Sequence, residues 1–284
     1  MRVPWRDRRG KFLPFKAAVL AALCIPGLVS AWWWLNSDLG ARPINELIHN
    51  SGLWTIRLLL ISLAITPLRA ALDWPRLLLV RRMVGVTAMA YGLIHLTLYT
   101  IQQKWSVPFV ASEIVHRFYL TIGFIALLSL VALGVTSTDG MTRRMGRWWK
   151  RLHRLAYPAA VLAILHYFIQ SKANVSEPVF VAGLYVWLML WRLMPLKWQR
   201  YAAVYPVLAL ATGFITAWIE FAWYDIATHL PAWRVLMANE SLSFGLRPAH
   251  VVALTALGLS AVILLRRYTP APRSWLRLVP ARGG

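Results

Sequence analysis

Eight long apolar stretches, separated by short basic segments, dominate this chain of 284 residues. They cover residues 17–35, 53–68, 83–101, 118–135, 153–170, 178–194, 201–223 and 248–265. A helix needs about 20 mostly apolar residues to cross a hydrocarbon core that is about 30 Å thick. Because the backbone polar groups of a chain in lipid must be satisfied internally, we predict an all-α, polytopic membrane bundle with eight spans.

The basic residues indicate how the chain is oriented. The formal net charge is +21, with 31 Lys and Arg against 10 Asp and Glu, although 59% of the residues are hydrophobic. Most of the Lys and Arg lie in alternate segments between the spans, starting with the N-terminal segment, and most acidic residues lie in the others. Because cytoplasmic loops are rich in Lys and Arg, we predict that both termini are cytoplasmic. The charge is therefore a topology signal, and we exclude nucleic acid as a partner.

The N-terminus and the one cysteine narrow the choice of protein class. The first apolar stretch follows a basic start, as in a signal peptide, but no clear small-x-small cleavage site precedes Trp32. We therefore expect a retained first span. Cys24 is the only cysteine, which excludes an intrachain disulfide, a cysteine-ligated iron–sulfur cluster and the covalent attachment of haem. Any metal chemistry must depend on histidine.

Two histidines are placed at matching depth in the predicted spans. His95 lies 6 residues before the end of the third span, and His166 lies 4 residues before the end of the fifth. Both spans run from the cytoplasm outward, so the two imidazoles should lie at similar depth near the outer surface. Ionisable groups in a membrane usually mark a functional site, and imidazole is a common haem ligand. We predict that His95 and His166 bind one haem b from its two faces. The alternative is that each forms a hydrogen bond between helices.

A third histidine raises the question of a second haem. His153 lies 13 residues before His166, which is about 20 Å along an α-helix. On an ideal helix the two rings would not face the same way, unless Pro158 alters the winding. His153 is either a ligand of an inner haem or an interfacial histidine. Neighbouring cations could pair with haem propionates or with lipid phosphates; these are Arg147, Lys150, Arg151 and Arg154.

Two further residues are weaker candidates for cofactor binding. Gly92 lies three residues before His95, on the same helical face, and would leave room for the macrocycle. Arg57, in the second span, could pair with a haem propionate or extend to the outer interface. We expect the remaining histidines in outer loops or at span ends: His49, His116, His229 and His250. The loop with His49 is expected to lie above the outer haem.

Five stretches in the first six spans have the pattern of a known family. They are LGARPINELIH (39–49), LLLISLAITPLR (58–69), RRMVGVTAMAYGLIHLTLY (81–99), RFYLTIGFIALLSLVALGVTST (117–138) and RRMGRWWKRLHRLAYPAAVLAILHYF (143–168). In these stretches the chain resembles the haem-binding membrane subunit of the bacterial periplasmic methionine sulfoxide reductase system. That subunit belongs to a branch of the ferric-reductase-like transmembrane family.

The resemblance implies a function in electron transfer at the bacterial inner membrane. It implies haem b held by His95 and His166, with His153 for a second, inner haem. Electrons would pass from the quinone pool, or through a flavin reductase, to a periplasmic molybdopterin-containing subunit that reduces methionine sulfoxide. This chain would then be a redox subunit with no catalytic residues of its own. FMN is also associated with the family, although we can assign no feature of the sequence to it.

Two features depart from the family pattern. Two-haem ferric reductases have a second histidine earlier on the third span, where this chain has Arg81 and Arg82. A guanidinium is a poor iron ligand, so an inner haem would need another axial partner, and the two arginines are candidates only for contact with the cofactor. The second departure is the pair of spans within 195–268, which follow the family-like domain 17–194. Basic cytoplasmic segments, 1–16 and 269–284, flank the spans.

Two other functions fit the same residues. The chain could be a ferric reductase or a quinol-linked cytochrome b that acts without a protein partner. It could instead be a proton-coupled transporter whose buried histidines relay protons. A haem absorption spectrum separates the transporter from the two redox functions.

Overall fold

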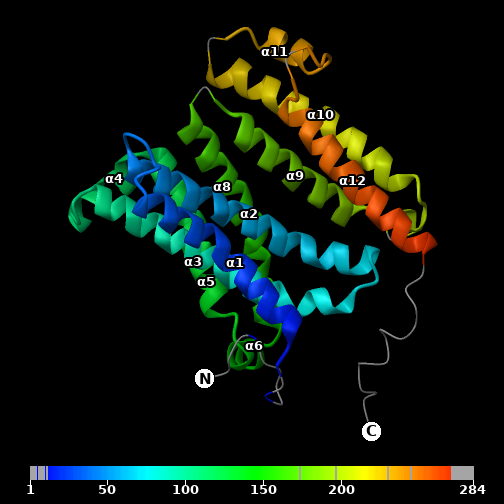
Figure 1. Ribbon diagram of the computed structural model, residues 1–284, viewed down its shortest axis with the longest axis horizontal. Coiled ribbons are helices and arrows are strands. Elements are labelled where there is room, and N and C mark those ends of the chain that lie inside the picture. Colours follow the sequence, from blue (N-terminus) through cyan, green and yellow to red (C-terminus); the bar gives the residue numbers. More distant parts are fainter. Residues whose placement is uncertain are drawn as a thin grey trace.

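The computed structural model describes residues 5, 10, 12–172, 174–195, 197–228, 230–243 and 245–269. In these ranges the regular elements are helices (Figure 1), which confirms the predicted all-α bundle. The long ones are α1 (Pro14–Leu35), α2 (Pro43–Ala71), α3 (Leu78–Gln102), α5 (Phe118–Val135), α8 (Ala156–Ser171), α9 (Ser176–Leu193), α10 (Val204–Ala227) and α12 (Pro248–Tyr268). The short ones are α4 (Val107–His116), α6 (Asp139–Met145), α7 (Arg147–Leu152) and α11 (Ala232–Ala238), with 3-10 turns η1 (Pro75–Leu77), η2 (His153–Leu155) and η3 (Trp198–Arg200).

Seven helical segments in the described part of the chain are long and apolar enough to cross a membrane. Every predicted span corresponds to a helix, but α9 is not among these seven. It carries Glu177 and Arg192 near its two ends and contacts α2, α8, α10 and α12. Because α9 packs largely against other helices, it can keep a less apolar sequence than a helix that faces lipid.

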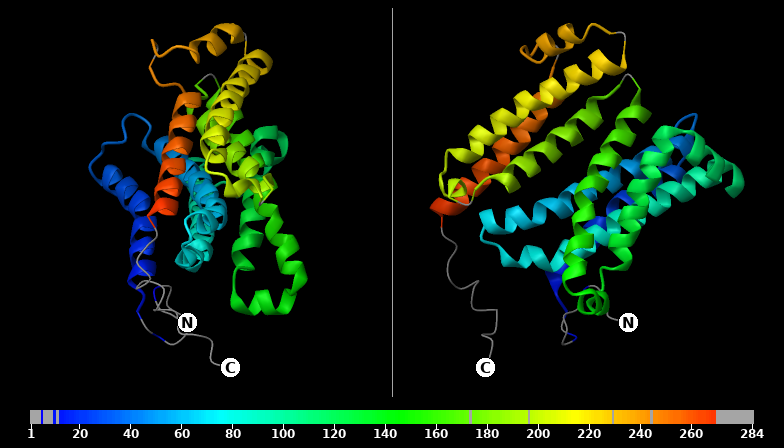
Figure 2. Two further views of the ribbon diagram at one scale, coloured as in Figure 1. Left: turned by 90° about the vertical axis from the view of Figure 1, so that its right-hand side faces the viewer. Right: turned by 180° about the vertical axis from the view of Figure 1, so that it is seen from behind.

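The long helices form two packed groups, and α9 of the second group also contacts α2 and α8 of the first. One group contains α2, α3, α5 and α8, with α1 beside α2 and α3, and the other contains α9, α10 and α12. Figure 2 shows the second group inclined along one side of the first, with α9 as the member nearest the first group. The turn from α8 to α9 and the short helix α4 lie at one end of the bundle, which we call the α4 end, and α6 lies at the opposite end, the α6 end (Figure 1).

A proline lies inside the first helix, and a tyrosine hydroxyl bonds to backbone groups beside it. Pro26 lies inside α1, where a proline removes a hydrogen bond and bends the helix. The Tyr91 hydroxyl accepts a hydrogen bond of 2.8 Å from the Gly27 N–H and donates one of 3.1 Å to the Leu23 carbonyl. The hydroxyl thus satisfies two backbone groups beside the proline and attaches α1 to α3.

Three other prolines lie within helices. The 3-10 turn η2 precedes α8, which begins at Ala156, and α10 begins at Val204, so Pro158 and Pro206 each lie in a first turn. There the missing N–H has no helical partner to lose. Pro67 lies inside α2, which continues past it to Ala71.

The α4 end also differs from the prediction. Because α2 begins at Pro43, His49 lies in a helix and not in a loop. The sequence did not predict α4, whose last residue is His116. His250 lies in the first turn of α12, whereas His229 is outside the described residues. Most of the terminal segments 1–16 and 269–284 are outside them as well.

Candidate functional site

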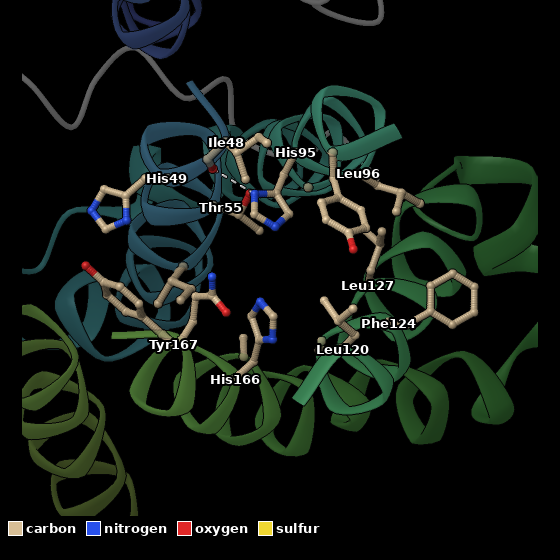
Figure 3. A pocket seen from close by; sticks show the side chains of 18 of the residues that line it. Ile48, His49, Thr55, His95, Leu96, Leu120, Phe124, Leu127, His166 and Tyr167 are labelled. Carbon is tan, nitrogen blue, oxygen red and sulfur yellow. Dashed lines mark hydrogen bonds between the residues drawn. The ribbon is translucent and has the colours of Figure 1, made fainter. Parts of the chain in front are cut away.

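A cavity of about 310 Å³ lies at the α4 end and contains the two histidines predicted to face each other. It is lined by residues of α2, α3, α5 and α8, and by Ile114 of α4. His95 enters it from α3 and His166 from α8, and Figure 3 shows the two rings pointing toward one another across the hollow. Their ring centroids are 6.3 Å apart, and the ring planes are at 87° to each other. The matched depth in the sequence thus corresponds to two side chains that face each other across the cavity.

Two backbone carbonyls orient these rings. The Nδ1 atom of His95 lies 2.8 Å from the Ile48 carbonyl oxygen, and Nδ1 of His166 lies 2.8 Å from the Tyr119 carbonyl oxygen. Since a carbonyl can only accept a hydrogen bond, Nδ1 carries the proton in both rings and donates it. Nε2 is therefore the atom with a free lone pair in each ring. Metal-binding histidines commonly have this arrangement, in which a partner on one nitrogen fixes the ring while the other nitrogen binds the metal.

Glycines on two neighbouring helices make room for the rings. A Cβ atom added at Gly123 of α5 would lie 2.7 Å from Nδ1 of His166, and one added at Gly52 of α2 would lie 3.0 Å from Cε1 of His95. Either methyl group would push its ring away from the carbonyl that orients it. The sequence analysis missed both glycines, because each lies on a different helix from the histidine it touches.

Gly92 lines the cavity and also lies where three helices pack together. A Cβ at this position would meet Leu127 Cδ1 at 2.9 Å and Thr55 Cγ2 at 3.4 Å. Its small size therefore allows α3 to approach α5 and α2.

The rest of the lining is apolar in the interior and polar toward the α4 end. Leucine and isoleucine side chains form the deeper walls. Polar residues from the ends of the helices line the outer part: Asn45, His49, Tyr99, Gln102, Tyr119 and Gln170. None of the described residues that line the cavity is Lys, Arg, Asp or Glu. This combination fits a flat, largely apolar ligand with a polar edge, held by two neutral nitrogen atoms.

His49, one of these polar residues, lies at the edge of the cavity near Tyr167. Its ring centroid is 5.8 Å from that of Tyr167, with the planes at 58° (Figure 3). The neighbouring residue Ile48 supplies the carbonyl that orients His95. The helical start of α2 therefore places two consecutive residues at the site.

His153 lies apart from this cavity and has protein partners on both nitrogens. Its ring stacks on Trp149, with centroids 3.8 Å apart and planes at 25°. Nδ1 is 3.1 Å from the Trp149 carbonyl oxygen, and Nε2 is 3.3 Å from the Ser137 hydroxyl oxygen. The 3-10 turn η2, His153–Leu155, separates α7 from α8, so His153 and His166 do not share one regular α-helix. A ligand at His153 would have to replace Ser137.

The candidate arginines do not line the cavity. Arg57 forms an ion pair of 3.2 Å with Glu177, and its guanidinium lies 5.4 Å from the centroid of the Trp54 ring. Arg82 pairs with Asp139 at 2.7 Å. Arg81 interacts electrostatically with Arg192 and Tyr157, so its surroundings are on α8 and α9. The structure therefore brings together His95 and His166 but none of the arginines predicted to join them.

Comparison with known proteins gives the family. Residues 51–164 match a family model described as "Ferric reductase like transmembrane component". The chain is 44% identical over 197 residues to "Protein-methionine-sulfoxide reductase heme-binding subunit MsrQ" of Xanthomonas campestris pv. campestris (strain 8004), a match that covers 66% of this chain and 88% of the relative. The chain belongs to the MsrQ family. The MsrQ protein of Rhodospirillum rubrum is 42% identical over 200 residues, covering 69% of this chain and 92% of the relative. No solved structure matches.

Membership of the MsrQ family confirms the predicted resemblance and, with the apolar helices, identifies a multi-pass integral membrane protein. The matches leave about a third of the chain without a counterpart in these MsrQ relatives. The segment that matches the family model includes His95 and His153 and ends at residue 164, two residues before His166.

Proposed function

We propose that this chain is a haem b subunit that transfers electrons across the membrane to a periplasmic methionine sulfoxide reductase. The observation that carries the proposal is the pair of imidazoles, His95 and His166, which face each other with Nδ1 bound to a carbonyl and Nε2 free. The printed names of the MsrQ relatives, heme-binding subunits of this reductase, support the choice of cofactor and partner.

The two histidines would provide the axial nitrogens for one haem iron. A ring separation of 6.3 Å leaves room for one metal ion at the usual distance of about 2 Å from an imidazole nitrogen. The carbonyls of Ile48 and Tyr119 would hold the rings in place, and Gly52 and Gly123 would let the rings lie against their helices. When bound, haem b supplies a reversible one-electron couple, while the protein sets its ligands and the polarity around it.

The direction of electron flow follows from the predicted topology. With both termini in the cytoplasm of a bacterial cell, the α4 end would face the periplasm and the α6 end the cytoplasm. Electrons would come from the quinone pool or from a flavin such as FMN. The molybdopterin-containing catalytic subunit would receive them at the α4 end. We place this function in the six-helix domain 17–194, to which 195–268 adds two helices.

The proposal is tested by the haem content of the purified protein. The wild type should show a reducible b-type spectrum, and a pyridine haemochrome assay should give at least one haem per chain. His95→Ala and His166→Ala should each lose the haem of the cavity. His116→Ala is the matched control, because His116 is exposed on α4 and bonds only to its own helix. A colourless wild-type protein from haem-replete cells would refute the proposal and favour a transporter.

A ferric reductase without a partner is the second candidate, supported by the family model that matches residues 51–164. Both functions need the haem, so the acceptor must decide between them. Membranes that contain this chain should reduce methionine sulfoxide only when the periplasmic subunit is present. Rapid reduction of a ferric chelate in its absence would favour the second candidate.

A further inference from the structure

We propose that Arg117 binds a propionate of the haem in the His95–His166 cavity and that Arg57 does not. This inference rests on the proposed function and adds a cofactor-binding residue that neither the spans nor the histidine pattern indicates. It concerns the end of the cavity where α4 meets α5.

The cavity itself offers no positive charge for the two propionates of a haem. None of the described residues that line it is Lys or Arg. Carboxylic acids have unperturbed pKa values of about 4, so both propionates are anionic at neutral pH. Burying an unpaired carboxylate is very unfavourable. The propionates must therefore reach beyond the lining, to water or to a cation at the polar end of the cavity.

Arg117 is a cation that contacts this lining. It is the N-cap residue of α5, two residues before Tyr119, and its side chain interacts with that of Tyr119. The Tyr119 ring is nearly parallel to that of His166, with centroids 6.2 Å apart and planes at 23°, and its carbonyl orients the same histidine. Arg117 also interacts electrostatically with Tyr99, a second lining residue. A single guanidinium is thus linked to both sides of the polar edge.

The guanidinium of Arg117 still has donors to offer. Its Nε lies 2.6 Å from Glu113 Oε2, and an arginine has five N–H donors in a rigid fork. The Nη groups can therefore serve Tyr119 and a carboxylate together. Its side chain is 52% exposed, which leaves it free to turn toward a ligand. Tyr119 and the Glu113 carboxylate raise the pKa of Arg117, and a guanidinium is charged at neutral pH in any case.

Arg57 is the rival, because it also lies near a lining residue, Tyr167. Its guanidinium, however, extends to Glu177 on α9 and over Trp54. Neither Glu177 nor Trp54 lines the cavity, whereas Arg117 neighbours two lining residues, Tyr119 and Tyr99. The two arginines therefore form a matched pair for the test.

The experiment measures the haem midpoint potential of the purified protein with Arg117→Gln and with Arg57→Gln. A cation that pairs with a propionate favours the reduced haem, so Arg117→Gln should shift the ferrous/ferric ratio about tenfold toward ferric at a fixed potential, which is 59 mV for one electron. Arg57→Gln should leave the potential unchanged. Arg117→Gln alone leaves the Glu113 carboxylate without its partner. The double variant Arg117→Gln/Glu113→Gln removes that carboxylate as well and should still show the shift in midpoint potential.

A second arm distinguishes a direct contact from a distant charge. The protein is reconstituted with haem dimethyl ester, whose propionates cannot ionise, and the difference between wild type and Arg117→Gln should then disappear. A difference that persists would overturn the proposed contact, as would a shift with Arg57→Gln alone or an unchanged potential in the double variant. If the wild type binds no haem, the proposed function itself fails, and that outcome is separate from all of these.

Discussion

Two regions at the α4 end contain buried polar groups, and they use them in opposite ways. In the cavity that α3 and α8 help to line, His95 and His166 each have one nitrogen bound to a carbonyl, and their rings point into the cavity. Between α10 and α12, the polar groups mostly bind one another. A buried polar group with an unused atom aimed into a cavity indicates a ligand, whereas a group whose atoms all meet protein partners indicates a structural role.

The second region is centred on Glu220, of which only 1% is exposed. Its two carboxylate oxygens accept hydrogen bonds from Arg247 Nη2 at 2.5 Å and from Asn239 Nδ2 at 2.9 Å. His250 has both nitrogens occupied: Nδ1 accepts from the Arg247 N–H at 3.1 Å, and Nε2 donates to the Asn239 carbonyl at 2.9 Å. This network connects α10 to the residues that follow α11 and to the start of α12, so it holds the segment between the last two helices in place.

The largest expected effect distinguishes these two regions by haem content. His95→Ala or His166→Ala should remove the haem of the cavity, because one imidazole cannot hold the iron from both faces. His250→Ala is the control with an equally buried environment, and its haem content per folded chain should equal that of the wild type. Absorbance at the Soret band, divided by protein concentration, measures both. Equal haem loss in all three variants would show that the contrast between the regions is not real.

The second effect is on stability. Changes in the Glu220 network should lower the free energy of unfolding and leave the haem content of the folded protein unchanged. Glu220→Ala leaves Arg247 without its carboxylate partner, while Asn239 keeps the Val235 carbonyl as an acceptor. Removing one member of a buried ion pair usually lowers the free energy of unfolding by about 3–5 kcal/mol. We expect about 3 kcal/mol, because 23% of the Arg247 side chain is exposed and water can partly replace the carboxylate. Unfolding in detergent, followed by circular dichroism, measures the loss.

A double variant tests whether the Glu220 and Arg247 side chains interact. Glu220→Met/Arg247→Met removes both charges and should be less destabilised than the sum of the two single changes, because it leaves no unpaired charge behind. In all these variants the cavity haem should be retained by the folded protein. An additive double variant would mean that the two side chains do not interact.

The third effect concerns Gly123, whose lack of a side chain leaves room for the His166 ring in the cavity. Gly123→Ala places a Cβ 2.7 Å from His166 Nδ1 and should weaken haem binding about tenfold, which corresponds to 1.4 kcal/mol. Gly258→Ala in α12 is the matched control, since nothing lies within 4 Å of its Cβ and alanine favours a helix over glycine. Haem titration of the apoprotein gives both affinities. Retained affinity in Gly123→Ala would show that the ring has room to move.

The sequence could predict the pairing of His95 and His166 because helical rise converts residue number into depth, and both spans run the same way. It could not show what orients the rings, since each accepting carbonyl lies 47 residues earlier on another helix. Gly52 and Gly123 were missed for the same reason, since each touches a histidine on another helix. Local hydropathy also failed at the start of α2 and at α4, where amphipathic residues form helices at the edge of the apolar zone.

The smallest effect tests the comparison at the α6 end, where His153 resembles His250 more than His95. Both of its nitrogens have protein partners, and its ring stacks on Trp149. His153→Gln should therefore leave the spectrum and midpoint potential of the cavity haem unchanged, and it should lower stability by about 1 kcal/mol through the lost stacking.

The haem-to-protein ratio of the same variant then shows whether the protein binds the predicted inner haem. If the ratio falls by half while the cavity haem is retained, His153 binds a second iron, and occupied nitrogens would no longer exclude a ligand role. If the ratio is unchanged, an unused nitrogen directed into a cavity is what marks a haem ligand in this chain.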